Sequence, residues 1–349
     1  MEKKYNICYD LLTILACLMV VFFHMNGIVY TYSDTISWKI SVIERCVVYS
    51  AIPIFFMLSG AKLMEYRSRY STREYVKKRL IRVGIPFLFW NVFYMVFQRV
   101  ISPEHSFHSV KDFVSMFLNS EFQDRYWFFF PLFAVYAAIP VISLVLQAKD
   151  HRKYLWYTVY AAFVLNWVLK PLCGLLGIRF NSNLMMPVCS GYLMYALFGY
   201  LISTEKWSRV KRMALYLLAL VSGAFAVCYT INISKAVGET QLAMASYSYF
   251  PSALTGAAIF VFVKHLFDKP FVHSALQKNE KFTSLVRTVS NCCMGVWLSH
   301  SLAIMVVSHI TGFASSNYIL RFVFPLIVFP ACVAGTYVLK KIPLLKHIV

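Results

Sequence analysis

Hydrophobic residues along this chain come in blocks of about 18 to 25, close to the roughly 20 apolar residues with which a helix spans a bilayer core. Short polar stretches separate the blocks. The pattern predicts an all-α fold, a polytopic membrane bundle of about ten transmembrane helices that forms a single domain over residues 1–349. The expected spans are 7–30, 42–64, 83–101, 126–147, 154–170, 184–203, 213–233, 247–267, 289–311 and 319–340.

Four of the connecting segments are long: 31–41, 65–82, 102–125 and 268–288. The segment 102–125 has amphipathic stretches and predicts a short helix at the membrane interface. Turn and cap signals for it stand at Ser102-Pro103 and at Ser109. No internal repeat and no appended soluble domain are visible, so we expect any chemistry to lie inside the bundle or at its two faces.

Lysine and arginine residues orient the bundle. Cytoplasmic loops carry the excess of positive charge in membrane proteins. With the N-terminus inside, the cytoplasmic segments hold 25 of the 34 basic residues, so both termini are predicted to be cytoplasmic. The net charge of +19 follows from this topology and from attraction to anionic lipid headgroups. No RNP-like or zinc-finger pattern accompanies the charge, which argues against nucleic acid as a partner.

A basic run from residue 66 to Arg82 leads directly into the third span at Pro86. Arg79 and Arg82 stand at its end, next to the membrane. Such a patch either holds the phosphates of a ligand or anchors the loop to lipid headgroups. The charge pattern alone favours neither interpretation.

Polar residues inside the first span are the leading candidates for function. Ionisable groups at membrane depth are costly unless they are buried in protein or line a watery cavity. At 100° per residue Asp10, Thr13 and His24 fall on one helix face, and Asp10 and His24 lie about 21 Å apart along the axis. A lone membrane histidine more often bonds a neighbouring helix. His300, expected at a similar depth in the ninth span, favours general-base chemistry instead.

Two further groups stand at the predicted outer face. Glu44 and Arg45 either pair with each other, bind a ligand or lie at headgroup level. Arg125, Tyr126 and Trp127 begin the fourth span and are typical of an interfacial aromatic belt. The sequence has no metal-ligand spacing, no phosphate-binding loop and no dinucleotide fingerprint, so no metal site and no permanently bound cofactor are expected.

Several segments in order resemble the bacterial integral-membrane acyltransferase family 3. The opening run from Asp10 to Phe23-His24 is similar to the family's start, in which an Asp-x-x-Arg sequence precedes a histidine. Later segments resemble further family signatures across the whole chain: Ile52-Pro53-Ile54-Phe55-Phe56-Met57-Leu58-Ser59-Gly60, Lys78-Arg79-Leu80-Ile81-Arg82, Tyr126-Trp127-Phe128, Gly295-Val296-Trp297-Leu298-Ser299-His300 and Lys340-Lys341-Ile342-Pro343-Leu344-Leu345.

The chain departs from that family at two positions. Thr13 replaces the family's arginine, and the family histidine before Leu-Trp-Phe aligns with Arg125 or is absent. If the arginine neutralises negative charge on the donor or an intermediate, this chain must supply a positive charge from another residue or work differently. A changed substrate, a weaker enzyme and lost activity all stay open.

The resemblance implies a membrane-embedded O-acyltransferase of the bacterial cytoplasmic membrane. Its members usually move an acetyl group from acetyl-CoA, or another acyl-CoA, to a hydroxyl of an envelope glycan or a lipid-linked sugar. His24 is then the expected general base, with Asp10 and Thr13 as its supporting polar face and Arg79 and Arg82 as contacts to the phosphates of acyl-CoA. The acceptor mouth is expected at Trp127, Tyr126, Arg125, His300, Arg45 and Glu44.

Two alternatives belong to other classes. A transporter or flippase of a glycan or small solute also places ionisable groups at membrane depth, but inverted repeats or paired broken helices, its usual signs, are not visible. A degenerate, non-catalytic member of the family is the other alternative, and Thr13 makes it more credible.

Overall fold

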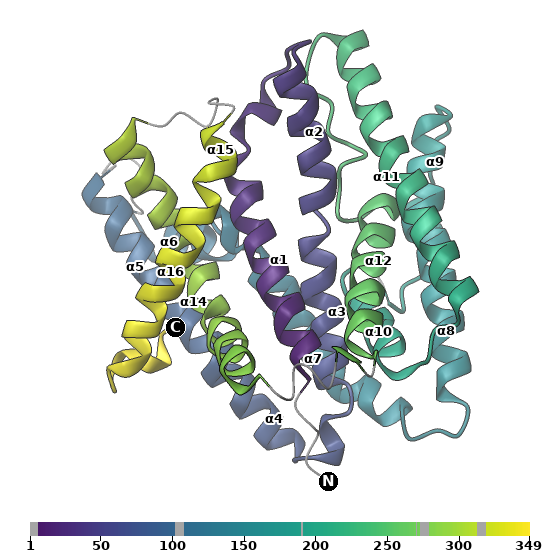
Figure 1. Cartoon of the computed structure of the whole chain (residues 1–349), viewed down its shortest axis with the longest axis horizontal. Coiled ribbons are helices and arrows are strands. Elements are labelled where there is room, and N and C mark those ends of the chain that lie inside the picture. Colours follow the sequence, from purple (N-terminus) through teal and green to yellow (C-terminus); the bar gives the residue numbers. More distant parts are fainter. Residues whose placement is uncertain (1–5, 102–107, 190, 270, 273–278, 313–318) are drawn as a thin grey trace.

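A computed structural model describes residues 6–101, 108–189, 191–269, 271–272, 279–312 and 319–349 (Figure 1). These residues form helices and no strand, and nine of the helices are long and apolar enough to cross a membrane. A tenth apolar helix, Leu193–Thr204, is shorter. The chain is an all-α polytopic membrane bundle, as the sequence predicts.

The α-helices follow one another along the chain in this order: α1 (Ile7–Met25), α2 (Ile36–Val48), α3 (Ala51–Leu63), α4 (Thr72–Arg79), α5 (Ile85–Ile101), α6 (Val110–Leu118), α7 (Phe129–Val145), α8 (His151–Ala162), α9 (Lys170–Leu175), α10 (Leu193–Thr204), α11 (Arg209–Val237), α12 (Phe250–Phe267), α14 (Glu280–Thr311), α15 (Leu320–Val323) and α16 (Pro325–Lys341).

Several boundaries differ from those predicted, among them the start of α14, which lies at Glu280 rather than at residue 289. The second span begins at Ile36, because Thr35 caps the helix by accepting a hydrogen bond from the Trp38 N–H. The sequence predicts a loop over 65–82, but α4 and the π-helix Leu80–Gly84 join this segment to α5. The segment is rich in charged residues, so its hydropathy is low and gives no sign that the helix continues. In the segment 184–203 the α-helix starts only at Leu193.

The predicted interfacial segment does contain a helix, α6. Ser109 caps it by accepting a hydrogen bond from the Asp112 N–H, as its sequence indicates. The turn predicted at Ser102-Pro103 lies outside the described residues.

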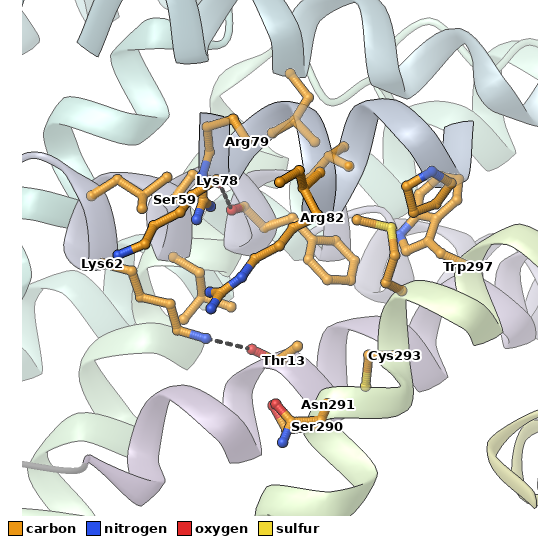
Figure 2. A pocket seen from close by; sticks show the side chains of 18 of the residues that line it. Thr13, Ser59, Lys62, Lys78, Arg79, Arg82, Ser290, Asn291, Cys293 and Trp297 are labelled. Carbon is orange, nitrogen blue, oxygen red and sulfur yellow. Dashed lines mark hydrogen bonds between the residues drawn. The ribbon is translucent and has the colours of Figure 1, made fainter. Parts of the chain in front are cut away.

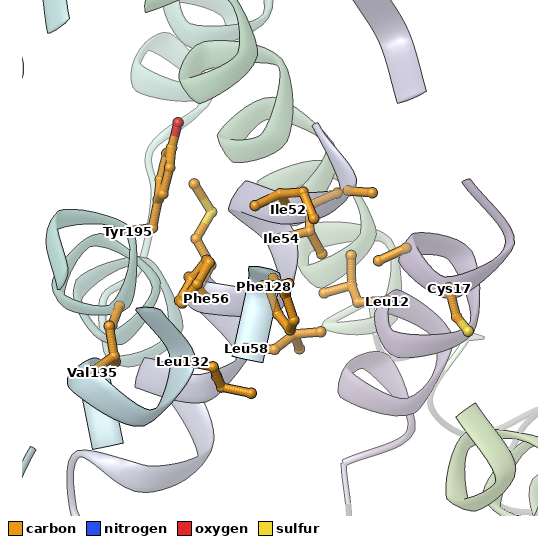
Figure 3. Packing of buried hydrophobic residues seen from close by; sticks show 14 of the residues in the cluster. Leu12, Cys17, Ile52, Ile54, Phe56, Leu58, Phe128, Leu132, Val135 and Tyr195 are labelled. Atoms are coloured by element: carbon orange, nitrogen blue, oxygen red, sulfur yellow. The ribbon is translucent and has the colours of Figure 1, made fainter. Parts of the chain in front are cut away.

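The centre of the bundle is packed around α3. Figure 3 shows Ile52, Phe56 and Leu58 of this helix facing side chains from α1, α7 and α10. Glycines let two backbones approach closely: a Cβ on Gly60 would overlap the carbonyl group of Ala196, and a Cβ on Gly199 would overlap the backbone of Met57. The helices α3 and α10 are therefore in direct backbone contact.

A second seam joins the first helix to α14. Asp10 of α1 accepts a hydrogen bond of 2.8 Å from Ser290. One to two turns further along, Cys17 contacts the carbonyl oxygen of Cys293 at 3.5 Å. At the far end the rings of His24 and His300 lie side by side. Because the partners advance in the same direction along both helices, α1 and α14 run parallel.

The close approach of α3 and α10 predicts a large effect of one methyl group. Gly199→Ala forces the two backbones apart, and we expect a loss of about 1–3 kcal/mol in stability, as for other overpacked cores. Thermal unfolding of the detergent-solubilised protein measures this as a lowered Tm. The matched control is Gly174→Ala, since a Cβ there meets nothing within 4 Å. Equal Tm values for the two variants would contradict the proposed backbone contact.

Candidate active site

A cavity of about 890 Å³ opens at the end of the bundle where α1 begins; we call it the basic cavity. Seven of the described residues that line it carry a lysine or arginine side chain, against one carboxylate, Asp10. The volume lies within the roughly 300–1,000 Å³ that is usual for small-molecule sites. The excess of positive charge favours a ligand with several negative charges. The basic residues are Lys62, Arg69, Lys78, Arg79, Arg82, Lys340 and Lys346.

The two arginines that the sequence singles out both lie on this cavity. The π-helix between α4 and α5 carries Arg82, and Arg79 ends α4 directly before it. Wider turns of this kind often occur at functional sites. Arg79 lies over the rings of Tyr75 and Tyr136, at 6.0 and 5.6 Å, and its buried Nε has no hydrogen-bond partner among the described residues. Both guanidinium groups are therefore placed to meet a ligand in the cavity.

A lysine that sequence analysis did not single out reaches Thr13. Lys62 of α3 donates a hydrogen bond of 3.2 Å to the Thr13 hydroxyl, and its ammonium nitrogen lies 3.9 Å from Asp10. Thr13 in turn donates to the carbonyl oxygen of Tyr9. Figure 2 shows Lys62 and Arg82 extending toward Thr13 from different helices. A cationic nitrogen from α3 thus lies beside position 13 of α1, where this chain has no charge of its own.

A second cavity, of about 370 Å³, surrounds the other end of α1; we call it the histidine cavity. His24 lies on its wall in the last turn of α1, and Asn26 ends that helix. The His24 side chain is half-buried, and no hydrogen bond ties its ring to another described residue. The ring nitrogens are therefore available to a ligand in this cavity.

His300 stands directly behind His24, with 5.2 Å between the ring centroids. It is fully buried, and its Nδ1 lies 2.8 Å from the Trp297 carbonyl oxygen and 3.1 Å from that of Val296. Because both partners only accept, Nδ1 carries the hydrogen, and in the neutral ring Nε2 then keeps a lone pair. No described residue bonds to Nε2. In this tautomer the free side of His300 accepts a hydrogen bond and does not donate one.

Stacked rings form one wall of the histidine cavity. Trp127 stacks on Tyr247 at 5.0 Å, and Tyr247 stacks on Tyr49 at 4.9 Å. The Arg45 guanidinium lies 4.3 Å from the Tyr49 ring centre and donates to the hydroxyls of Tyr49 and Tyr30. Tyr247 precedes α12 and has no sequence signal that distinguishes it from other interfacial tyrosines. Only its contacts with Trp127 and Tyr49 in the folded chain show that Tyr247 belongs to the histidine cavity.

Of the remaining residues named from the sequence, some line the histidine cavity, whereas Tyr126, Glu44 and Arg45 line neither cavity. Arg125 lines the histidine cavity together with Trp127. Tyr126 lines neither cavity: it is fully buried, and its hydroxyl donates to the carbonyl oxygen of Leu298. Glu44 pairs with Arg321 at 3.8 Å, so the alternative pairing with Arg45 is not the one found. Among the described residues no cluster of histidine, cysteine, aspartate and glutamate has the makings of a metal site.

Trp297 links the two cavities. It is the one described residue that lines both, and only 5% of its surface is exposed. Its ring stacks on Phe128 at 4.8 Å and meets His300 edge-on at 5.8 Å. Figure 2 shows Trp297 on the opposite side of the basic cavity from Lys62. The indole therefore stands between the basic cavity and the space beside His24.

Comparison with known protein families finds a match over nearly the whole chain. A family model described as an acyltransferase domain, acyltransferase family 3, matches residues 6–341. No curated protein and no solved structure matches the chain. The matched segment includes nearly all residues of both cavities.

The charge of the basic cavity predicts how it binds polyanions. We expect adenosine 3′,5′-bisphosphate to bind the purified protein and Arg82→Ala to weaken that binding about tenfold or more, because a charge-assisted hydrogen bond contributes about 1.5–3 kcal/mol. Calorimetric titration measures the dissociation constant, which should rise with salt. Arg99→Ala is the control, since Arg99 is exposed and lines neither cavity. Equal affinities of the two variants would count against the basic cavity as the binding site.

Proposed function

The chain belongs to acyltransferase family 3, and from that membership and its two cavities we propose that it is a membrane O-acyltransferase that moves an acetyl group from acetyl-CoA to a hydroxyl of a cell-envelope polysaccharide or a related exported molecule. The observation that carries the proposal is the meeting of a strongly basic cavity with a histidine-lined one at a single side chain, Trp297. A donor with several phosphates and an acceptor with hydroxyls need such unlike sites.

The basic cavity is the proposed donor site. Acyl-CoA carries its phosphates at one end and its thioester at the other. Arg79 and Arg82 then bind phosphate oxygens, for which guanidinium groups are well shaped. The thioester extends toward Trp297 and the histidine cavity. Lys62 adds the positive charge that Thr13 lacks.

The histidine cavity is the proposed acceptor site. His24 takes the proton from the acceptor hydroxyl as its oxygen bonds to the thioester carbon. The carbon–sulfur bond then breaks, and His24 returns the proton to the sulfur of coenzyme A. His300, buried behind His24, accepts a hydrogen bond through Nε2 from the ring of His24 and so orients that ring. Trp127, with Tyr247 and Tyr49 behind it, offers an aromatic surface to a sugar.

Both ends of the described chain support the proposed orientation. Asn6 and Val349 line the basic cavity, so the two ends lie at the same side of the bundle. A cytosolic donor requires this side to face the cytoplasm, in agreement with the distribution of lysine and arginine. In this arrangement the acyl group crosses the membrane barrier while coenzyme A stays in the cytosol. From the family resemblance we propose that this membrane is the cytoplasmic membrane of a bacterium.

Loss of the His24 imidazole is the direct test of the proposed reaction. Cells that lack the chromosomal copy are complemented with the wild type or with His24→Ala, and envelope glycans are analysed by mass spectrometry for a gain of one acetyl unit. We expect the wild type to restore the modification and the variant to lose at least about 100-fold in rate, the usual contribution of a general base. His309→Ala is the control, because His309 is exposed and lines neither cavity.

Two results would contradict this proposal in different ways. Full acetylation by His24→Ala would remove the general-base role and leave the transferase. If neither chain changes any glycan, but vesicles containing the wild type take up a solute, the protein is a transporter. If neither activity is found, the non-catalytic alternative holds.

The contact between Lys62 and Thr13 predicts that the positive charge at this position can be supplied by either α3 or α1. Lys62→Met should raise the KM for acetyl-CoA about tenfold or more, since a charged hydrogen bond is lost. Thr13→Arg alone places a second cation beside Lys62 and should also impair transfer. The double variant Thr13→Arg, Lys62→Met restores one cation at this position and should recover much of the affinity. A double variant no better than Lys62→Met would show that the cation at this position has no role in donor binding.

A further inference from the structure

Trp297 carries a polar group that the fold leaves unused. The indole is almost fully buried, and its Nε1–H has no hydrogen-bond partner among the described residues. A buried donor without a partner has lost its hydrogen bonds to water and gained none in return, so such groups are rare and call for an explanation. Two other buried indoles in the chain do have partners: Trp38 donates to the carbonyl oxygen of Val29, and Trp90 to that of Ile348.

The ring itself is firmly placed. Phe128 stacks on one face with an interplanar angle of 18°, and His300 meets the indole nearly at a right angle. Phe129 packs edge-on at 5.8 Å. These contacts fix the direction of the N–H without using it. A donor held in this way, in a water-poor site, needs no reorganisation when charge develops next to it.

We infer that the Nε1–H of Trp297 binds the thioester carbonyl oxygen of the acyl donor and stabilises the negative charge that develops on it during transfer. This inference rests on the proposed function. When the acceptor oxygen bonds to the carbonyl carbon and its proton passes to His24, the carbonyl oxygen becomes an oxyanion that accepts the indole hydrogen bond. As the carbonyl re-forms, the carbon–sulfur bond breaks and the sulfur takes the proton back from His24.

Neighbouring groups leave this role to the indole. The Nδ1–H of His300 is engaged with two carbonyl oxygens, and the free Nε2 of His300 is an acceptor. The aromatic neighbours Phe55, Phe128 and Phe129 have no donor. Each lysine or arginine side chain that lines a cavity lines one only, Arg125 the histidine cavity and the others the basic cavity, whereas Trp297 lines both. The indole N–H is therefore at the place where donor and acceptor meet.

The test replaces the indole by a ring without a donor. Trp297→Phe keeps an aromatic partner for Phe128 but removes the N–H. We expect kcat to fall about 100-fold to 1,000-fold, the usual effect of removing one oxyanion donor, while the KM for acetyl-CoA changes little. Trp167→Phe is the matched control: Trp167 is also buried, lines neither cavity, and its replacement should leave kcat unchanged. Transfer is measured with purified protein in vesicles.

A second variant separates the lost donor from altered packing. Replacement of Trp297 by 3-benzothienylalanine keeps the two-ring shape and puts sulfur in place of the N–H. A low kcat with this residue supports the inference, and a kcat equal to that of the wild type overturns it, whether or not Trp297→Phe folds. A rise in KM alone would also overturn it, because it would assign Trp297 to binding. If the wild type itself transfers no acyl group, the proposed function fails and the inference fails with it.

Discussion

Contacts between α1 and α14 keep three polar groups of α1 out of lipid, and both cavities are built at the ends of this seam. Asp10 meets Ser290, Cys17 meets the Cys293 carbonyl oxygen, and His24 meets the ring of His300. In a bilayer each of these α1 side chains needs a partner or a watery surface. A change in the crossing of the two helices would move Asp10 and His24 in opposite directions, so the seam sets the position of the proposed donor and acceptor sites together.

The separation of the sites follows from the same geometry. In the proposed reaction the phosphates of the donor bind among the cations around Thr13, whereas the imidazole of His24 acts at the other end of α1, away from those charges. One helix satisfies both needs because Asp10 and His24 lie about 21 Å apart along α1. Only the small reacting end of a donor has to extend from the first environment to the second. An enzyme built in this way has no need to move the charged part of its donor across the membrane.

The sequence was sufficient to predict features that depend on a single helix, such as its span and the residues that share a face. The spacing of Asp10, Thr13 and His24 fixes their common face, and hydropathy fixes most spans, because both are local properties. It did not foresee contacts between distant segments: Lys62 beside Thr13, Tyr247 on Trp127, and Glu44 on Arg321 rather than Arg45. It also assigned Tyr126 to the acceptor mouth beside Trp127, although adjacent residues of a helical turn point in different directions. The 3₁₀ turn Asp124–Phe128 directs Tyr126 toward Leu298 and Trp127 toward the cavity.

The aromatic boundary between the cavities also protects the chemistry. In the proposed reaction, a thioester next to His24 is open to hydrolysis if water reaches the same point. Phe128 and Trp297 stack at this boundary, and Phe55 packs against both of them. Rings of this size exclude water from the contact that they cover, yet they leave the indole N–H as a single directed donor. Exclusion of water strengthens every remaining electrostatic interaction, because charge is less screened in a medium of low dielectric constant. In the proposed reaction these side chains therefore favour the hydroxyl of the bound acceptor over water.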